Sequence, residues 1–190
     1  MEKKRFTEVK AFYGYYPGLV AVVTVDTGAE RNAMAAGWNV ALSFVPPLYG
    51  VAIAPIRHTH DLMLKADAFG VNFVPLEATQ LIGAVGGTSG RDMDKFAAFH
   101  IATESSLRTS APVLADAYVT YECELRDHHV FGDHTLFAGE IVAMHIAEGA
   151  FSAQKISQLD AVSPAIYLGH DYYLRPAPDS EIVHVPRGVG

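Results

Sequence analysis

The sequence of 190 residues is short of cysteine and of charged residues. Cys123 is the only cysteine, so no disulfide can form within the chain, and a secreted, disulfide-stabilised domain is not indicated. Charged residues make up 18% of the chain and hydrophobic residues 50%, which favours a globular domain over a disordered one. We interpret the low charge density as a sign that a second subunit covers part of an apolar surface.

Nucleic-acid binding and membrane insertion also lack support in the sequence. The net charge is -7 and no stripe of Lys and Arg is present, which argues against a nucleic-acid partner. No uninterrupted apolar run reaches the roughly 20 residues that span a bilayer. The charged start, residues 1–5, is not followed by the apolar segment of a signal peptide. We therefore expect a cytoplasmic protein without a membrane or nucleic-acid partner.

Several catalytic and cofactor motifs are absent as well. The chain has no P-loop and no G-x-G-x-x-G after its first apolar run, which argues against a Rossmann nucleotide site. It has neither a Gly-x-Ser-x-Gly elbow nor H-E-x-x-H. The adjacent His128 and His129 would point to opposite faces of a strand. We therefore expect neither a serine hydrolase nor a metal site.

The apolar pattern predicts a mainly β protein. Apolar and β-branched runs predict strands at 19–25, 39–44, 48–54, 69–74, 118–125 and 136–146. Helices or helical turns are predicted at 61–65, 77–85, 95–100 and 154–159, with Thr59 as a possible cap of the first. Many short strands with few helices are typical of an antiparallel barrel, so we predict one such domain over residues 1–190. Within it, Cys123 is interpreted as a small core residue rather than as a redox thiol.

The most informative segment is the uncharged stretch Asn32-Ala33-Met34-Ala35-Ala36-Gly37-Trp38. Small residues let the main chain approach a flat ligand closely, because no branched or long side chain intervenes. The neighbouring amide of Asn32 can both donate and accept hydrogen bonds, which suits a heterocycle with imide-like edges. The segment is therefore a candidate wall of a binding site.

A second candidate cluster is Arg57-His58-Thr59, which offers a guanidinium, an imidazole and a hydroxyl before a predicted helix. That combination suits a phosphate monoester, because a guanidinium binds phosphate in a bidentate manner. The alternative is an exposed loop arginine beside an ordinary helix cap.

Two further clusters leave the same kind of choice open. Arg91 and Lys95 follow a glycine-rich loop, residues 86–90, whose backbone N–H groups could bind an anion. The alternative is that Asp92, Asp94 and Lys95 form a solvated ion pair. Gly132-Asp133-His134 precedes a strong strand, so His134 could reach a ligand from a strand end. Its alternative is a routine turn followed by a surface histidine.

Taken together in their order, these motifs resemble the flavin reductase-like, FMN-binding split-barrel family, and within it the flavoredoxin-like branch. The resemblance covers nearly the whole chain. It rests on Asn32-Ala33-Met34, Trp38, Ser43-Phe44-Val45-Pro46-Pro47, Arg57-His58-Thr59, Phe69-Gly70-Val71-Asn72, residues 89–96, Glu122-Cys123 and residues 132–140.

The resemblance implies a homodimer of split barrels, each with FMN near the dimer interface. Residues 32–36 would line the isoalloxazine ring, Arg57 and Thr59 would hold the phosphate, and Lys95 or Arg91 would add positive charge. His134 would lie on the nicotinamide side as the one catalytic, positioning residue, and Tyr167 and Tyr172 would close over the site. The segment from about 150 to 190 would cover the site or the interface. The implied cofactor-binding set is Asn32, Ala33, Met34, Ala35, Ala36, Trp38, Ser43, Arg57, His58, Thr59, Asn72, Arg91, Lys95 and Phe96.

The resemblance also implies an FMN-binding oxidoreductase that is reduced by NADH or NADPH and passes electrons to free flavin, a ferric chelate or a protein partner. Many flavin reductases carry hydroxyl residues where this chain has Ala35, Gly37 and Trp38. That departure favours an alternative, a flavoredoxin-like electron carrier without pyridine-nucleotide activity. A reductase subunit that supplies reduced flavin to a monooxygenase is a further alternative. Trp38 itself would either shield the flavin or belong to a core or interface.

Overall fold

A computed structural model describes residues 1–9, 11–177, 180 and 182–183 of the chain. Its main feature is a seven-stranded antiparallel sheet with the strand order β3-β2-β6-β9-β10-β5-β4. The strands of this sheet are β2 (Ala21–Asp26), β3 (Arg31–Ala36), β4 (Asn39–Phe44), β5 (Pro47–Ile53), β6 (Ala68–Phe73), β9 (Val119–Phe131) and β10 (His134–Ile146). The predicted mainly β, antiparallel fold is confirmed.

The sheet curls into a split barrel whose two edge strands, β3 and β4, follow one another in the chain. A hydrogen bond from the Ala52 N–H to the Trp38 carbonyl, 2.9 Å long, ties the connection between them to β5. Inside the barrel, Phe69 and Phe137 are fully buried. Gly139 permits this packing, because a Cβ at that position would lie 2.6 Å from the Phe69 ring.

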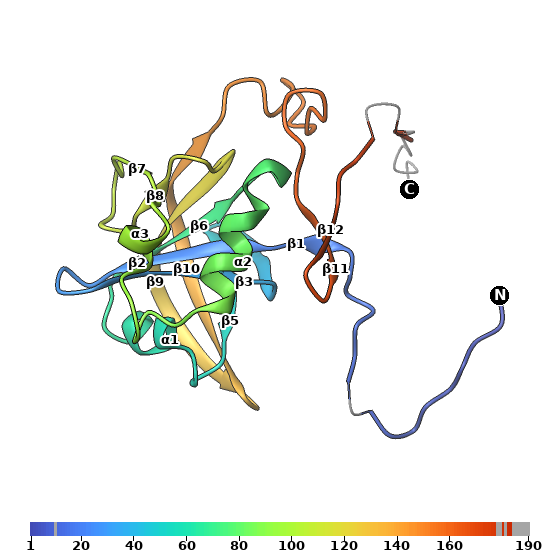
Figure 1. Cartoon of the computed structure of the whole chain (residues 1–190), viewed down its shortest axis with the longest axis horizontal. Coiled ribbons are helices and arrows are strands. Elements are labelled where there is room, and N and C mark those ends of the chain that lie inside the picture. Colours follow the sequence, from blue (N-terminus) through green and yellow to red (C-terminus); the bar gives the residue numbers. More distant parts are fainter. Residues whose placement is uncertain (10, 178–179, 181, 184–190) are drawn as a thin grey trace.

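Helices cover the outer side of one end of the sheet. They are α1 (His58–Met63), η1 (Leu76–Ala78), α2 (Thr79–Gly87) and α3 (Lys95–Ala98). Ile82 and Val85 of α2 pack with Val22 of β2 in a second apolar cluster, and Figure 1 shows α2 lying across β2 and β3. Because β2 is buried on both faces, its sequence is an almost continuous apolar run instead of an alternating one.

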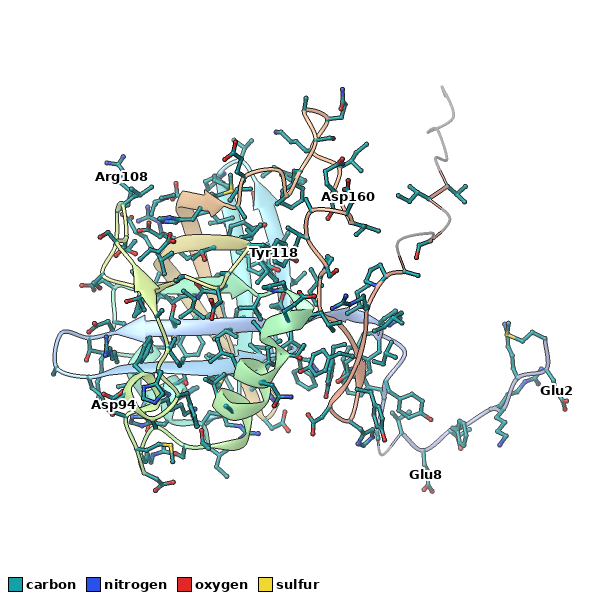
Figure 2. The ribbon with its side chains drawn as sticks, turned by 45° about the horizontal axis from the view of Figure 1, so that its top comes forward. Glu2, Glu8, Asp94, Arg108, Tyr118 and Asp160 are labelled. Atoms are coloured by element: carbon teal, nitrogen blue, oxygen red, sulfur yellow. The ribbon has the colours of Figure 1, made fainter. Side chains whose placement is uncertain are left out.

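Two small sheets complete the fold. β1 (Gly18–Leu19) pairs with the hairpin of β11 (Ile166–Gly169) and β12 (Tyr172–Leu174), and β7 (Thr103–Glu104) pairs with β8 (Val113–Leu114). The β11–β12 hairpin stands beside the barrel next to β1 (Figure 1). Figure 2 shows Asp160 on the segment that leads to this hairpin, and Glu2 and Glu8 on an N-terminal arm that extends away from the barrel.

The structure corrects three local predictions. The helix predicted at 61–65 begins at His58, and Thr59 does not cap it, because Arg57 occupies the cap position and Thr59 lies inside the helix. Strands β9 and β10 are longer than predicted and leave a tight turn at Gly132 and Asp133 between them. The helical turn predicted at 154–159 is wrong: the segment is irregular, with one isolated bridge between Phe151 and Ser157.

The helices in the described part of the chain are short, and α2 has nine residues. None of them has the length and apolar character required to cross a membrane.

Candidate functional site

A cleft of about 600 Å³ lies where the end of β3, the start of α1 and the end of α2 meet the β11–β12 hairpin. Its volume is within the range of small-molecule and cofactor sites. The lining comprises Tyr16, Val20, Asn32, residues 34–38, 52–54, 56–59, 82–83 and 85–90, Lys95, His134, Tyr167, Asp171 and Tyr173.

One end of the cleft is cationic. Lys95 is 3% exposed, and its Nζ donates to the carbonyls of Ala33 (2.9 Å) and Val85 (2.7 Å). Burial, and secondarily the charge of Arg57, lowers the pKa of Lys95 to about 8. Within the described residues neither the buried Lys95 nor the exposed Arg57 has a carboxylate partner, so an anionic ligand would compensate the buried charge of Lys95 with Arg57 beside it. The prediction of a solvated ion pair for Lys95 is therefore wrong.

The glycine-rich loop closes tightly against this end. A Cβ on Gly90 would lie 2.5 Å from Oδ1 of Asn32 and 2.9 Å from Cδ2 of His58. A Cβ on Gly86 would lie 3.2 Å from the Cβ of Ala35. Glycine at position 90 thus allows the loop backbone to reach β3 and α1, where larger residues would force the elements apart.

Side chains beneath the loop are held in place by buried hydrogen bonds. Nδ2 of Asn32 donates to Oγ1 of Thr59 (2.9 Å), and both residues are buried. Nε2 of His58 lies 2.5 Å from the Glu30 carboxylate, whereas its Nδ1 is buried and has no hydrogen-bond partner among the residues that the structure describes. An orphaned buried polar atom beside two unpaired cations fits a site that is completed by a polar ligand.

The other end of the cleft is aromatic. The rings of Trp38 and His134 lie 4.3 Å apart, and the indole N–H of Trp38 donates to the Tyr15 hydroxyl (3.1 Å). Gly132 has a φ of +59°, which lets the turn reverse within two residues and sets His134 at the start of β10. Nδ1 of His134 lies 2.7 Å from the Asp133 carboxylate; this hydrogen bond, followed by the imidazole charge, lowers the pKa of Asp133.

Most of the residues expected at the site line this one cleft. They are Asn32, Met34, Ala35, Ala36, Trp38, Arg57, His58, Thr59, Lys95 and His134. The structure thus brings together segments that are up to about a hundred positions apart in the sequence. Tyr167 also lines the cleft, but its companion is Tyr173, because Tyr172 is 71% exposed and does not line it.

Besides Tyr172, five residues of the expected cofactor-binding set do not line the cleft. Ala33 of β3 and Phe96 of α3 are buried in the second apolar cluster, and the Arg31 guanidinium lies 4.4 Å from the Phe96 ring centre. Ser43 lies on β4, and its Oγ accepts from the Val45 N–H (3.2 Å). The remaining two, Arg91 and Asn72, make other contacts.

Arg91 donates to the Asp61 carboxylate (2.6 Å) and to the Ile56 carbonyl (2.9 Å), so it braces the start of α1 from outside. Asn72 is fully buried. Its Nδ2 donates to Val22 and Thr24, and its Oδ1 accepts from Leu114 and Thr120. These bonds use all of its hydrogen-bonding capacity inside the core.

Sequence reasoning missed Tyr16, Asp171 and Tyr173. Tyr16 lies in the aromatic stretch 12–16, which has no regular spacing. Asp171 lies in the turn of the β11–β12 hairpin and Tyr173 on its second strand, and the register of this hairpin is visible only in the fold. Local sequence contains no signal that would have identified them.

Comparison with known proteins shows one consistent family. A model described as the flavin reductase like domain matches residues 13–173. A crystal structure of an FMN-binding protein from Thermus thermophilus with bound 1-cyclohex-2-enone is 37% identical, with a TM-score of 0.84, covering 98% of this chain and 100% of that one.

Two sequence relatives agree with this. An uncharacterized protein of Pyrococcus abyssi is 36% identical over 140 residues, which are 74% of this chain and 80% of that protein. An NADH-dependent FMN reductase of Streptomyces nodosus subsp. asukaensis is 30% identical over 164 residues, covering 77% of this chain and 78% of the relative.

Proposed function

This chain belongs to the flavin reductase-like family, and from that premise we propose that it is an FMN-dependent oxidoreductase reduced by NADH or NADPH. The observation that carries the proposal is the composition of the cleft. Two cations without carboxylate partners, Arg57 and Lys95, lie at one end, and an uncharged main-chain wall, residues 34–37, lies beside them. A phosphorylated planar heterocycle has the matching distribution of charge.

The residues present fit FMN, and each end of the cleft would hold one part of it. Arg57, Lys95 and Thr59 would bind the phosphate, with Nδ1 of His58 as a further polar contact. Residues 34–37 would flank the ring system, because their small side chains leave the backbone accessible. Bound FMN supplies the hydride chemistry, and the protein supplies binding, orientation and exclusion of water.

His134 would position the nicotinamide of the electron donor. Its hydrogen bond with Asp133 and its tilted contact with the Trp38 ring hold the imidazole in the lining of the cleft. The relative from Streptomyces is an NADH-dependent FMN reductase, which supports a pyridine nucleotide as donor. The acceptor would be free flavin, a ferric chelate or a protein partner, and the protein would act as a cytoplasmic homodimer.

A second candidate function is a flavoredoxin-like electron carrier without pyridine-nucleotide activity. It is favoured by the absence of any hydroxyl side chain in residues 32–38 and by Trp38 at the aromatic end of the cleft. An indole there would shield a permanently held flavin from nicotinamide.

Anaerobic mixing with NADH distinguishes the two functions. When purified protein reconstituted with FMN is mixed with NADH, the visible absorption band of oxidised flavin is expected to disappear. If the band persists with both NADH and NADPH but disappears with dithionite, the protein is a carrier and the reductase proposal is wrong. Dialysis tests a third function, a reductase subunit that supplies reduced flavin to a monooxygenase. Such a subunit would release FMN on dialysis, whereas a protein with FMN as its prosthetic group would retain it.

A further inference from the structure

The lining of the cleft carries its positive and negative charge on different parts of the fold. Arg57 and Lys95 come from the start of α1 and from α3. Among the described residues of the lining, Asp171 is the one with a carboxylate, and it lies in the turn of the β11–β12 hairpin. This hairpin belongs to the small sheet with β1 and stands beside the barrel (Figure 1). The cleft is therefore cationic on the helix side and anionic at the hairpin turn.

A chain of aromatic rings leads from Trp38 to this hairpin. The indole N–H of Trp38 donates to the hydroxyl of Tyr15, and the ring centre of Tyr15 lies 4.3 Å from that of Tyr16. The ring centre of Tyr16 is in turn 5.1 Å from that of Tyr167 on β11. Three of these residues, Trp38, Tyr16 and Tyr167, line the cleft. Planar side chains of this kind suit a nucleotide base, because a base can stack on their faces.

Asp171 lies at the hairpin end of these rings. Its backbone N–H donates to the hydroxyl of Tyr167 (3.4 Å). After burial and the neighbouring Tyr167, the charge of Asp171 helps to raise the pKa of Tyr173 to about 12, so the field of the carboxylate reaches the aromatic lining. Among the ion pairs of the described residues, none involves Asp171. This carboxylate therefore faces a ligand with its charge uncompensated.

The cationic groups of the lining are already assigned or paired. The phosphate of FMN would occupy Arg57 and Lys95. The two imidazoles, His58 and His134, each lie within hydrogen-bond distance of a neighbouring carboxylate. NADPH differs from NADH by a phosphate on the 2′ position of the adenosine ribose, and proteins that accept this group supply an arginine for it. The ionised group left in the described lining is a carboxylate, which has the wrong sign for a second phosphate.

We propose that Asp171 makes this protein select NADH over NADPH. Its carboxylate would accept a hydrogen bond from the 2′-hydroxyl of the adenosine ribose, and it would repel a phosphate at that position. The adenine would stack on the tyrosines of the lining, while the nicotinamide lies beside His134. The inference rests on the proposed function, because it takes a pyridine nucleotide as the electron donor.

Calorimetric titration with NAD⁺ and NADP⁺ tests the selection without turnover, because neither nucleotide can reduce flavin. With FMN-reconstituted protein, the dissociation constant for NADP⁺ should be at least about tenfold higher than that for NAD⁺. Added salt should narrow this difference, because it screens the repulsion.

Asp171→Asn removes the charge and keeps an acceptor. Asparagine also tolerates the φ of +64° at this position, so the turn should be preserved. The affinities for NAD⁺ and NADP⁺ should then agree within about threefold, because the repulsion is gone. Asp171→Gly suits the same φ but removes the acceptor too, so it should also weaken NAD⁺ binding. Asp160→Asn is the matched control, since Asp160 is an exposed carboxylate before the hairpin and outside the cleft lining, and it should keep the wild-type ratio.

Equal affinities of the wild type for the two nucleotides, or an unchanged ratio in Asp171→Asn, would overturn the inference. So would a protein that retains FMN but binds neither nucleotide, a result that would favour the electron carrier. The titrations are repeated with flavin-free protein in phosphate buffer, where inorganic phosphate takes the cationic end of the cleft. The same ratio is thus measured without FMN, and a failure to bind FMN alone would contradict only the proposed function.

Discussion

The carboxylate of Glu122 lies in the barrel wall at 2.7 Å from Nε2 of His145, and it is completely buried. Its oxygens also accept hydrogen bonds from the backbone N–H groups of Leu107, Arg108 and Thr109. One side chain of β9 thereby fixes the loop that precedes β8 and the far end of β10.

We expect this carboxylate to make the fold sensitive to acid. Burial alone raises the pKa of Glu122, but the hydrogen bonds from His145 and the three amides outweigh it and hold the pKa at about 2. Since the folded pKa is lower than the ordinary value of 4.5, the stabilisation is present above pH 4.5 and is lost as the pH falls toward 2. The difference corresponds to about 3 kcal/mol. Urea unfolding at several pH values measures it.

Glu122→Gln should remove that pH dependence and lower the free energy of unfolding at pH 7 by about 2–4 kcal/mol. Glu124→Gln on the same strand is the control, because Glu124 is partly exposed in an ion pair with Arg126, and it should change stability by less than about 1 kcal/mol. Equal losses in both variants would contradict the role assigned to the buried carboxylate.

FMN affinity should fall at alkaline pH because of Lys95. Its pKa of about 8 belongs to the protein without ligand, where burial and Arg57 disfavour the charged form. A bound phosphate favours that form, so binding takes up a proton and the affinity decreases up to about tenfold per unit above pH 8. Titration by flavin fluorescence measures this. Riboflavin, which lacks the phosphate, should show no such dependence, and neither should Lys95→Met with FMN.

Arg57, which lines the cleft, and Arg91, which does not, should behave differently. Arg57→Ala should weaken FMN binding by about 1.5–3 kcal/mol, the value of a charge-assisted hydrogen bond. Arg91→Ala should have little effect on affinity, because its guanidinium is already bound to Asp61 and Ile56 outside the cleft. Calorimetric titration with FMN compares them. Undiminished retention in Arg57→Ala would remove Arg57 from the phosphate site.

One glycine of the loop and one glycine outside the cleft give a pair of matched substitutions. Gly90→Ala should reduce FMN affinity at least about tenfold, because its Cβ would meet Asn32 at 2.5 Å and push the loop or the amide aside. Gly14→Ala, outside the cleft and with nothing within 4 Å of the added Cβ, should leave affinity unchanged. Similar affinities for the two variants would show that the close approach at Gly90 does not shape the site.

His134→Ala should slow reduction by NADH while FMN remains bound. The imidazole contacts Trp38 and Asp133, and among the described residues it forms no hydrogen bond with Arg57 or Lys95. Stopped-flow measurement of flavin bleaching reports the rate, and ultrafiltration reports retention. His129→Ala serves as the control, since His129 lies on the same hairpin and its side chain is 70% exposed. Identical reduction rates in both variants would make His134 an ordinary turn residue.

Sequence reasoning was most successful where a residue's role follows from its local pattern. The apolar run of β2, the turn at Gly132 and the Arg57-His58-Thr59 cluster all lie where their spacing indicated. Sequence reasoning was less successful where the role of a residue depends on the direction in which its side chain points. Lys95 was expected either at a ligand or in a solvated ion pair, and its burial against two backbone carbonyls depends on how α3 packs behind β3.

Asn72 illustrates the same limit for motifs taken from a family resemblance. Its position in a recurring motif suggested contact with the cofactor, but a motif does not say whether a polar side chain faces a ligand or the core. Ser43 and Arg91 differ from the expectation for related reasons, since both find partners within the chain. Only three-dimensional contacts separate such residues from true ligands.

The four hydrogen bonds of Asn72 join β2, β6, β8 and β9 at one point. A mutational screen that measures only enzymatic activity would therefore score a substitution of Asn72 like one of Arg57, although Asn72 stabilises the fold and does not line the cleft. Measuring the thermal midpoint together with the activity would distinguish the two residues. Substitution of Asn72 should lower both the thermal midpoint and the activity, whereas substitution of Arg57 should lower only the activity.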